Sequence, residues 1–131
     1  MDKIIHAVGI SGSLRSASTN TGLLRCAQTN LPAGMTLEIL NIGAVPFYNA
    51  DDVQNGRTEI SKPIIEKIAA ANALVFACPE YNFSITPALK NIIDWASREP
   101  ENRALNNKPV AILGSGGGMR TAPAQYHLRQ I

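Results

Sequence analysis

The chain has 131 residues and a mass of 14.0 kDa, which is enough for one hydrophobic core and too little for two. Its net charge is only +2, aromatic residues make up 5%, and basic residues do not cluster, which argues against nucleic-acid and membrane partners. Cys26 and Cys78 are far apart and belong to no CxxC or Cys/His cluster, so neither a disulfide framework nor a metal site is predicted. The N-terminus lacks a signal-peptide pattern, and no apolar run could span a bilayer. We expect a single domain over residues 1–131, located in the cytoplasm.

Apolar runs and polar breaks alternate along the chain in a regular order. Residues 4–10 are mostly apolar and lead into glycine and serine, as expected of a strand buried on both faces. Apolar residues then recur at helical spacing, after three N-cap candidates at 18–20. Ser61 is predicted as the cap of a later helix, and Thr86-Pro87 as the cap and first residue of another. The predicted strands are 4–10, 36–42, 73–77 and 109–113, the predicted helices begin near residues 18, 61, 86 and 123, and 43–56 is predicted to be irregular.

This fourfold alternation of strand and helix predicts a parallel, doubly wound α/β sheet with helices on both faces. Ligands of such sheets bind beyond the carboxyl ends of the strands. Glycines and hydroxyl side chains are concentrated at those ends, in GISGSLRSASTN (9–20), CPEYNFS (78–84) and GSGGG (114–118). The ligand site is therefore predicted where these three loops meet.

The first loop has the composition of a phosphate-binding loop. Gly12 permits a tight turn, the amides that follow can point toward an anion, and Arg15 offers a charged fork for two phosphate oxygens. The loop contains no GxxxxGK[ST] or GxGxxG motif, and Gly9 stands where a phosphatase cysteine would be needed, so we expect binding without hydrolysis. The alternative is a serine-rich helix cap beside a solvated arginine. The residues assigned to the phosphate are Ser13, Arg15, Ser18, Thr19 and Asn20.

The other two loops are suited to a flat ring. Peptide groups of the second loop can form hydrogen bonds with the edge of a planar heterocycle, and Tyr81 and Phe83 can cover its face. The third loop is rich in glycine, so a flat ring can lie directly against its backbone. Taken singly, the second loop could also be a tight turn and the third a flexible connection, without a ligand. Taken together, they fit a heteroaromatic ring with a phosphate tail, which is the shape of FMN. The residues assigned to the ring are Pro79, Glu80, Tyr81, Asn82, Ser115, Gly116 and Gly117.

Several of these motifs occur together in one known family. GSLR (12–15), PEYN (79–82), LKNIIDWASR (89–98) and the terminal QYHLRQ (125–130) jointly resemble the NADPH-dependent FMN reductase family, and within it the NAD(P)H:quinone reductases of bacteria and plants. The resemblance covers the whole chain. It implies a flavodoxin-like, three-layer α/β/α fold. It also implies that FMN is bound by the residues assigned above other than Thr19.

The resemblance also implies a function. It points to an FMN-dependent oxidoreductase that passes two electrons from NADPH or NADH to a quinone-like acceptor by a ping-pong route, in a homodimer or homotetramer. The cofactor carries the chemistry, so no catalytic nucleophile, general base or metal ligand is assigned. The alternatives are a flavodoxin-like electron carrier, which the basic pI of 8.7 disfavours, and a truncated family member without turnover.

Two departures from the family pattern bear on these expectations. The segment GMRTAPA (118–124) replaces a more glycine-rich one, and its Arg120 is read either as a contact to the 2′-phosphate of NADPH or as a solvated side chain. The family continues past QYHLRQ with another strand and helix, so four of five strands are expected here. The fourth strand would then lie at an uncovered edge of the sheet. The chain would be a fragment or a natural truncation, or a partner would cover this edge.

Overall fold

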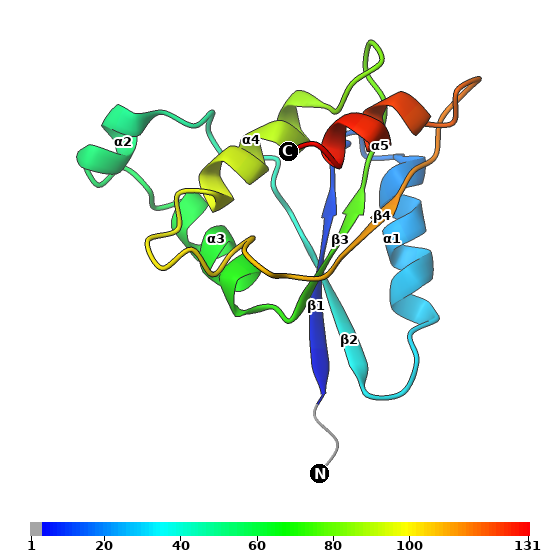
Figure 1. The fold of residues 1–131 in the computed structure, drawn as a ribbon, viewed down its shortest axis with the longest axis horizontal. Helices are drawn as coiled ribbons and strands as arrows, with labels where there is room; N and C mark the ends of the chain where they lie inside the picture. Colours follow the sequence, from blue (N-terminus) through cyan, green and yellow to red (C-terminus); the bar gives the residue numbers. More distant parts are fainter. Residues whose placement is uncertain (1–3) are drawn as a thin grey trace.

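The structure is a computed structural model that describes residues 4–131. Its strands β1 (Ile5–Ser11), β2 (Met35–Leu40), β3 (Ala73–Ala77) and β4 (Val110–Leu113) form one parallel sheet in the order β2-β1-β3-β4. The carboxyl ends of the strands point toward the top of Figure 1. The sheet confirms the predicted doubly wound parallel architecture, and the predicted third strand has the observed bounds.

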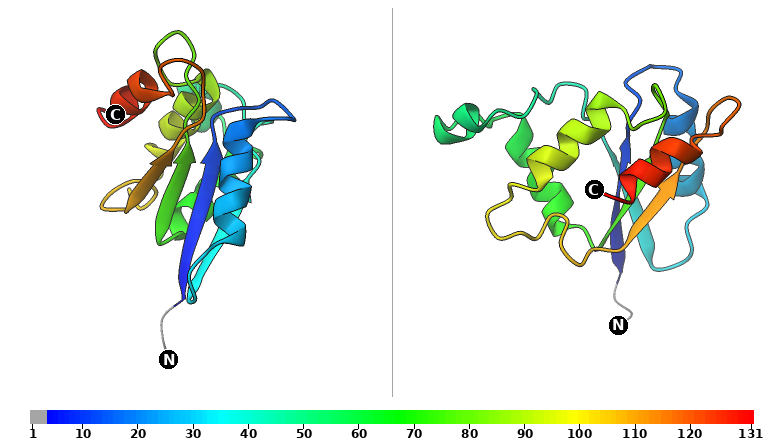
Figure 2. Two further views of the ribbon diagram at one scale, coloured as in Figure 1. Left: turned by 90° about the vertical axis from the view of Figure 1, so that its right-hand side faces the viewer. Right: turned by 45° about the horizontal axis from the view of Figure 1, so that its top comes forward.

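Helices cover both faces of the sheet, as predicted (Figure 2). Helix α1 (Thr19–Thr29) lies on one face, where Leu24 is fully buried and Gly9 leaves room for it; a Cβ built on Gly9 would lie 3.4 Å from the Leu24 Cδ2 atom. The other face carries α3 (Ser61–Ala70), α4 (Pro87–Ala96) and α5 (Ala122–Leu128). The main core lies there and includes Val8, Ile10, Ile68, Leu74, Phe76 and Ile92.

Two local predictions were wrong. The stretch predicted to be irregular contains a short helix, α2 (Ala50–Gln54), whose N-cap Asn49 accepts a hydrogen bond from the Asp51 N–H at 3.0 Å. Ser61, predicted as a cap, is instead the first residue of α3, and its hydroxyl points back to the Thr58 carbonyl. In both places a polar side chain forms a hydrogen bond with the nearby backbone, and composition alone does not show which backbone group it will bond to.

The order of the strands decides which loops can meet. β1 lies between β2 and β3, so the loop after β1 has the β2 end on one side and the β3 and β4 ends on the other. Within residues 4–131, β4 pairs with β3 alone, and Val110 at its start is half exposed, in line with the predicted bare edge.

Candidate functional site

The loop after β1 is locked to the loop after β3 through Gly12. The Gly12 N–H donates to the Ala77 carbonyl at 2.9 Å, and the Thr86 hydroxyl donates to the Gly12 carbonyl at 2.6 Å. A Cβ on Gly12 would lie 2.7 Å from the Thr86 Oγ1 atom and 2.9 Å from the Pro79 Cδ atom. The glycine is therefore required by this close approach, and not by a positive φ.

The side chains assigned to a phosphate lie at and before the N-terminus of α1. Ser18 is the N-cap and accepts a hydrogen bond from the Thr21 N–H at 3.2 Å. The Ser13 N–H donates to the Ser11 hydroxyl at 3.2 Å, which also accepts from the Thr21 hydroxyl at 2.9 Å. Arg15 is exposed, and its guanidinium makes no hydrogen bond or ion pair within residues 4–131. This loop is thus a rigid turn with an uncommitted cation beside a helix N-terminus, which suits an anion.

Asn20 joins the first loop to the third. Its Nδ2 atom donates to the Ser115 carbonyl, and its Oδ1 atom accepts from the Ser115 N–H, both at 2.9 Å. Its side chain is buried, so the structure uses this amide to position the two loops. The sequence pointed to Asn20 and Ser115 as separate ligand contacts and held no signal that they are bonded to each other.

The second loop carries a tight turn with two exposed aromatic rings. Tyr81 and Ser84 exchange backbone hydrogen bonds of 3.0 and 3.1 Å around Asn82 and Phe83. Both central residues have positive φ, 51° and 64°, as in a type I′ turn. A phenylalanine in this region is strained, because its Cβ is crowded by the backbone. The turn leaves the rings of Tyr81 and Phe83 exposed to solvent.

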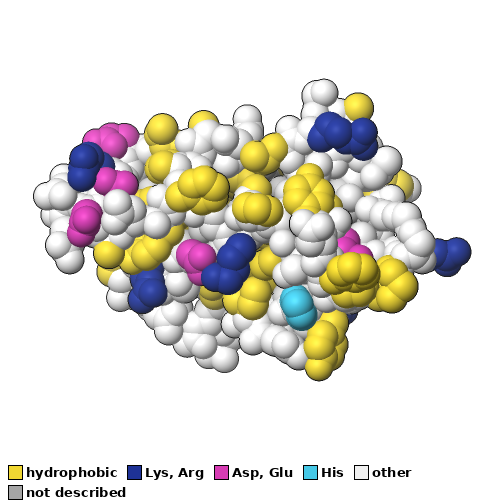
Figure 3. Space-filling model, turned by 90° about the horizontal axis from the view of Figure 1, so that it is seen from above, with side chains coloured by type: hydrophobic (Ala, Val, Ile, Leu, Met, Phe, Trp, Pro, Cys, Tyr) yellow, Lys and Arg dark blue, Asp and Glu magenta, His cyan; other side chains and the backbone are white. Residues whose placement is uncertain are grey.

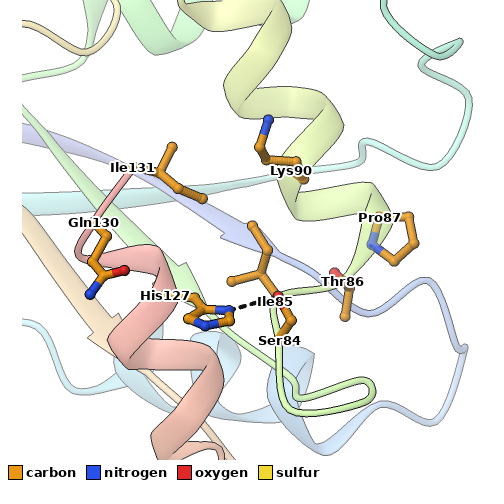
Figure 4. A pocket seen from close by; sticks show the side chains of 8 residues that line it. All are labelled: Ser84, Ile85, Thr86, Pro87, Lys90, His127, Gln130 and Ile131. Carbon is orange, nitrogen blue, oxygen red and sulfur yellow. Dashed lines mark hydrogen bonds between the residues drawn. The ribbon is translucent and has the colours of Figure 1, made fainter.

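Helix α5 is tied to the second loop by two polar contacts. The Glu80 carboxylate accepts a hydrogen bond from the Ala124 N–H at 3.3 Å, and the His127 Nδ1 and Ser84 Oγ atoms are hydrogen-bonded at 3.0 Å. A cavity of about 430 Å³ opens between α4 and α5 beside this contact (Figure 4). Glu80, assigned to the ring by sequence, therefore also caps the start of α5.

The third loop has one glycine that packing requires, Gly114, and two with open space around them, Gly117 and Gly118, while a Cβ on Gly116 would lie 3.0 Å from the Thr121 Cγ2 atom. A Cβ on Gly114 would lie 1.9 Å from the Thr121 Oγ1 atom, a requirement that sequence reasoning missed within the run GSGGG. A Cβ on Gly117 or Gly118 would meet nothing within 4 Å. The backbone from Gly116 to Gly118 is exposed.

Cys78 directly follows β3, at the start of the second loop. Burial raises the pKa of its thiol to about 11, the Glu80 carboxylate adds to the rise, and Arg129 opposes it. The side chain is fully buried, and its thiol donates to the Pro79 carbonyl at 3.6 Å. The thiol is therefore neutral and enclosed at physiological pH, and it is no nucleophile.

The three loops together fit the cofactor predicted for them. They offer an uncommitted guanidinium, a helix N-terminus, two exposed aromatic rings and an open glycine backbone at one edge of the sheet. A family model described as "NADPH-dependent FMN reductase" matches residues 5–131. The chain belongs to the NADPH-dependent FMN reductase family.

Individual relatives agree with this assignment. The chain is 50% identical to the NAD(P)H-dependent FMN reductase of Pseudomonas aeruginosa, over 99% of this chain and 70% of that protein. It is 43% identical to the NADPH:quinone oxidoreductase of Arabidopsis thaliana, over 98% of this chain and 66% of that protein. The chain thus spans about two thirds of the length of these relatives.

A solved structure agrees as well. FerB, a flavoenzyme NAD(P)H:(acceptor) oxidoreductase from Paracoccus denitrificans, superposes with a TM-score of 0.87 at 31% identity, over 97% of this chain and 70% of that one. The predictions of the family, of a flavodoxin-like fold, and of an FMN- and NAD(P)H-dependent oxidoreductase class are thereby confirmed. None of the helices in the described part of the chain has the length and apolar character needed to cross a bilayer.

Proposed function

We propose that this chain binds FMN at the carboxyl edge of its sheet and uses it to pass two electrons from NADPH or NADH to a quinone-like small molecule. The observation that carries this proposal is the junction of the three loops, through Gly12–Thr86 and Asn20–Ser115, beside the free guanidinium of Arg15. FMN supplies the redox chemistry when it is bound, by accepting a hydride and releasing an electron pair. The proposed binding residues are Ser13, Arg15, Ser18, Thr19, Asn20, Pro79, Glu80, Tyr81, Asn82, Ser115, Gly116 and Gly117.

Each loop has a separate part in this proposal. Arg15 and the N-terminal amides of α1 would hold the phosphate, with Asn20 acting through its bond to Ser115. Tyr81 would exclude water from one side of the ring. The exposed amides of residues 116–118 can donate to the polar edge of the ring and so stabilise its reduced, more negative form. No side chain is required to act as an acid or a base.

The acceptor class and the oligomeric state belong to the same proposal. A quinone-like acceptor is supported by the relatives from Arabidopsis thaliana and Escherichia coli, whose names describe quinone reductases. A homodimer or homotetramer is supported by the apolar side chains spread over the carboxyl edge in Figure 3. The segments that follow β3 and β4 also carry the exposed side chains of Tyr81, Met119 and Tyr126. A cytoplasmic location remains a prediction from the sequence.

Steady-state kinetics test the proposal. The FMN-loaded chain should oxidise NADPH or NADH in the presence of a simple benzoquinone, with parallel double-reciprocal lines as both substrates are varied. A chain that binds FMN firmly but turns over neither dinucleotide would instead be an electron carrier, and the proposal would be wrong.

A further inference from the structure

A second pocket lies on the β2 side of the β1 loop and shares Ser13 and Arg15 with the proposed phosphate site. It has a volume of about 360 Å³ and opens between the loop after β1, the outer side of α1 and the segment after β2. Its polar lining comes from Ser13, Arg15, Ser16, Thr21, Arg25 and Asn41. No aspartate or glutamate is among its lining residues. A pocket of this size can hold a nucleotide fragment.

The charge of the pocket is positive and unpaired. Among residues 4–131, the guanidinium groups of Arg15 and Arg25 make no hydrogen bond and no ion pair. By contrast, Arg57 and Arg103 are each paired with a carboxylate at 3.0 to 3.1 Å. Because Arg15 is assigned to the FMN phosphate, Arg25 is the cation of this cavity that is left for a second anion. A guanidinium favours an anion that accepts bidentate hydrogen bonds, and a phosphomonoester has that chemistry.

The part of this pocket near Arg25 and Asn41 lies away from the proposed flavin ring. The flavin ring is placed over the β3 and β4 ends, whereas Asn41 follows β2 on the opposite side of β1. Arg25 also lies six residues beyond Thr19 on α1, about 9 Å along the axis at the helical rise, which is beyond a phosphate bound at the helix N-terminus. Arg25 is also not among the residues assigned to the FMN phosphate.

We propose that this pocket binds the 2′-phosphate end of NADPH, with Arg25 as the residue that distinguishes NADPH from NADH. This inference rests on the proposed function. NADPH carries its 2′-phosphate far from its nicotinamide. The pocket lies near β2 and the flavin ring is proposed near β4, three strand spacings or about 14 Å away, and an extended dinucleotide can cover that distance. Leu14 and Ile42 supply apolar surface for the adenosine. An arginine beside the 2′ position is the general means of recognising this phosphate.

The proposal differs from the one that the sequence suggested. Arg120 was a candidate for the 2′-phosphate, but it follows β4, at the opposite edge of the sheet from this pocket. Arg25→Gln and Arg120→Gln therefore form a matched pair, since each removes one exposed guanidinium. Arg57→Gln is the control, because Arg57 lies just beyond α2 and pairs with Asp52.

The test has a binding arm that does not depend on turnover. Calorimetry of the FMN-loaded chain with adenosine 2′,5′-bisphosphate should show binding about tenfold tighter than with 5′-AMP. Arg25→Gln should abolish this preference, whereas Arg120→Gln and Arg57→Gln should keep it. In kinetics, Arg25→Gln should lower kcat/KM for NADPH about tenfold more than for NADH.

Three results would overturn the proposal. The two adenosine nucleotides could bind equally, Arg120→Gln could abolish the preference in place of Arg25→Gln, or FMN could displace the bisphosphate and show that the pocket belongs to the flavin phosphate. If neither dinucleotide is oxidised but the bisphosphate binds as expected, the proposed oxidoreductase function fails while the phosphate pocket stands.

Discussion

The Asn20 side chain makes two hydrogen bonds of 2.9 Å to the backbone of Ser115, which lies 95 positions later in the chain. One atom of the amide donates and the other accepts, so an asparagine satisfies both partners and a carboxylate satisfies only one. The bond joins the first turn of α1 to the loop after β4. Two parts of the proposed flavin site, one for the phosphate and one for the ring, are therefore held at a fixed separation.

Asn20→Ala should lower the free energy of unfolding by about 1–3 kcal/mol, because it leaves two partly buried backbone groups of Ser115 without partners. Asn20→Asp should also weaken FMN binding, since its carboxylate faces the Ser115 carbonyl. Denaturant unfolding and flavin titration measure the two effects. Asn30→Ala is the control, because the Asn30 side chain bonds only to neighbouring residues at the exposed end of α1. Equal losses in Asn20→Ala and Asn30→Ala would contradict the structural role of Asn20.

Gly12→Ala should destabilise the chain by about 1–3 kcal/mol, because its methyl group would push the β1 loop away from Thr86 and Pro79. Gly22→Ala, in the middle of α1, meets nothing within 4 Å and should stabilise the chain by about 0.5–1 kcal/mol. Thermal melts of the two variants should therefore shift in opposite directions. A neutral Gly12→Ala would mean that the two loops are not packed as described.

Gly117→Ala tests the ring site without disturbing the fold. The added methyl group meets no protein atom within 4 Å, so the melting temperature should change little. If a flat ring lies against this backbone, the same methyl group should weaken FMN binding by about tenfold, a cost of roughly 1.4 kcal/mol. Unchanged FMN affinity would place the ring elsewhere.

Phe83→Asn should stabilise the chain by about 0.5–1 kcal/mol, because asparagine tolerates the left-handed conformation better than phenylalanine. Phe47→Asn provides the control, since Phe47 is similarly exposed but has no positive φ. We also expect Phe83→Asn to raise KM for the quinone, because an apolar cover is lost. Equal stability of wild type and Phe83→Asn would show that the turn stores no strain.

Stability should fall at alkaline pH in a way that depends on Cys78. The pKa of the buried thiol is raised from 9.0 to about 11, so the unfolded chain loses this proton at a lower pH than the folded chain. The contribution is therefore complete below pH 9 and declines as pH rises toward about 11. Cys78→Ala should show a shallower loss over this interval. At pH 8, iodoacetamide should modify the exposed Cys26 and leave Cys78 intact.

Local signals in the sequence predicted the elements that depend on local chemistry. Thr86 and Pro87 open α4 as expected, because a hydroxyl cap and a proline act on the first turn alone. The run ALVFA forms β3, since its uninterrupted apolar character suits a strand buried on both faces. Ser61 was misjudged because a serine near a helix start can cap the helix or lie inside its first turn.

Contacts between residues that are far apart in the chain could not be predicted from the sequence. The bond between Asn20 and Ser115 and the clash that Gly114 avoids with Thr121 depend on the folded arrangement of loops. The composition of each loop indicated a ligand, but only their arrangement separates residues that position the loops from residues open to a ligand. Arg25 stood out in no motif, and its importance follows from the pocket that it lines.

The most direct measurement is a titration of the purified chain with FMN, followed by flavin fluorescence, for wild type and Arg15→Gln. We expect a saturable change near one FMN per chain and binding about tenfold weaker in Arg15→Gln, because one charged hydrogen-bonding group to the phosphate is lost. A chain that melts cooperatively but gives no saturable change, or binds FMN equally well without Arg15, would contradict the assignment of this edge of the sheet as the flavin site.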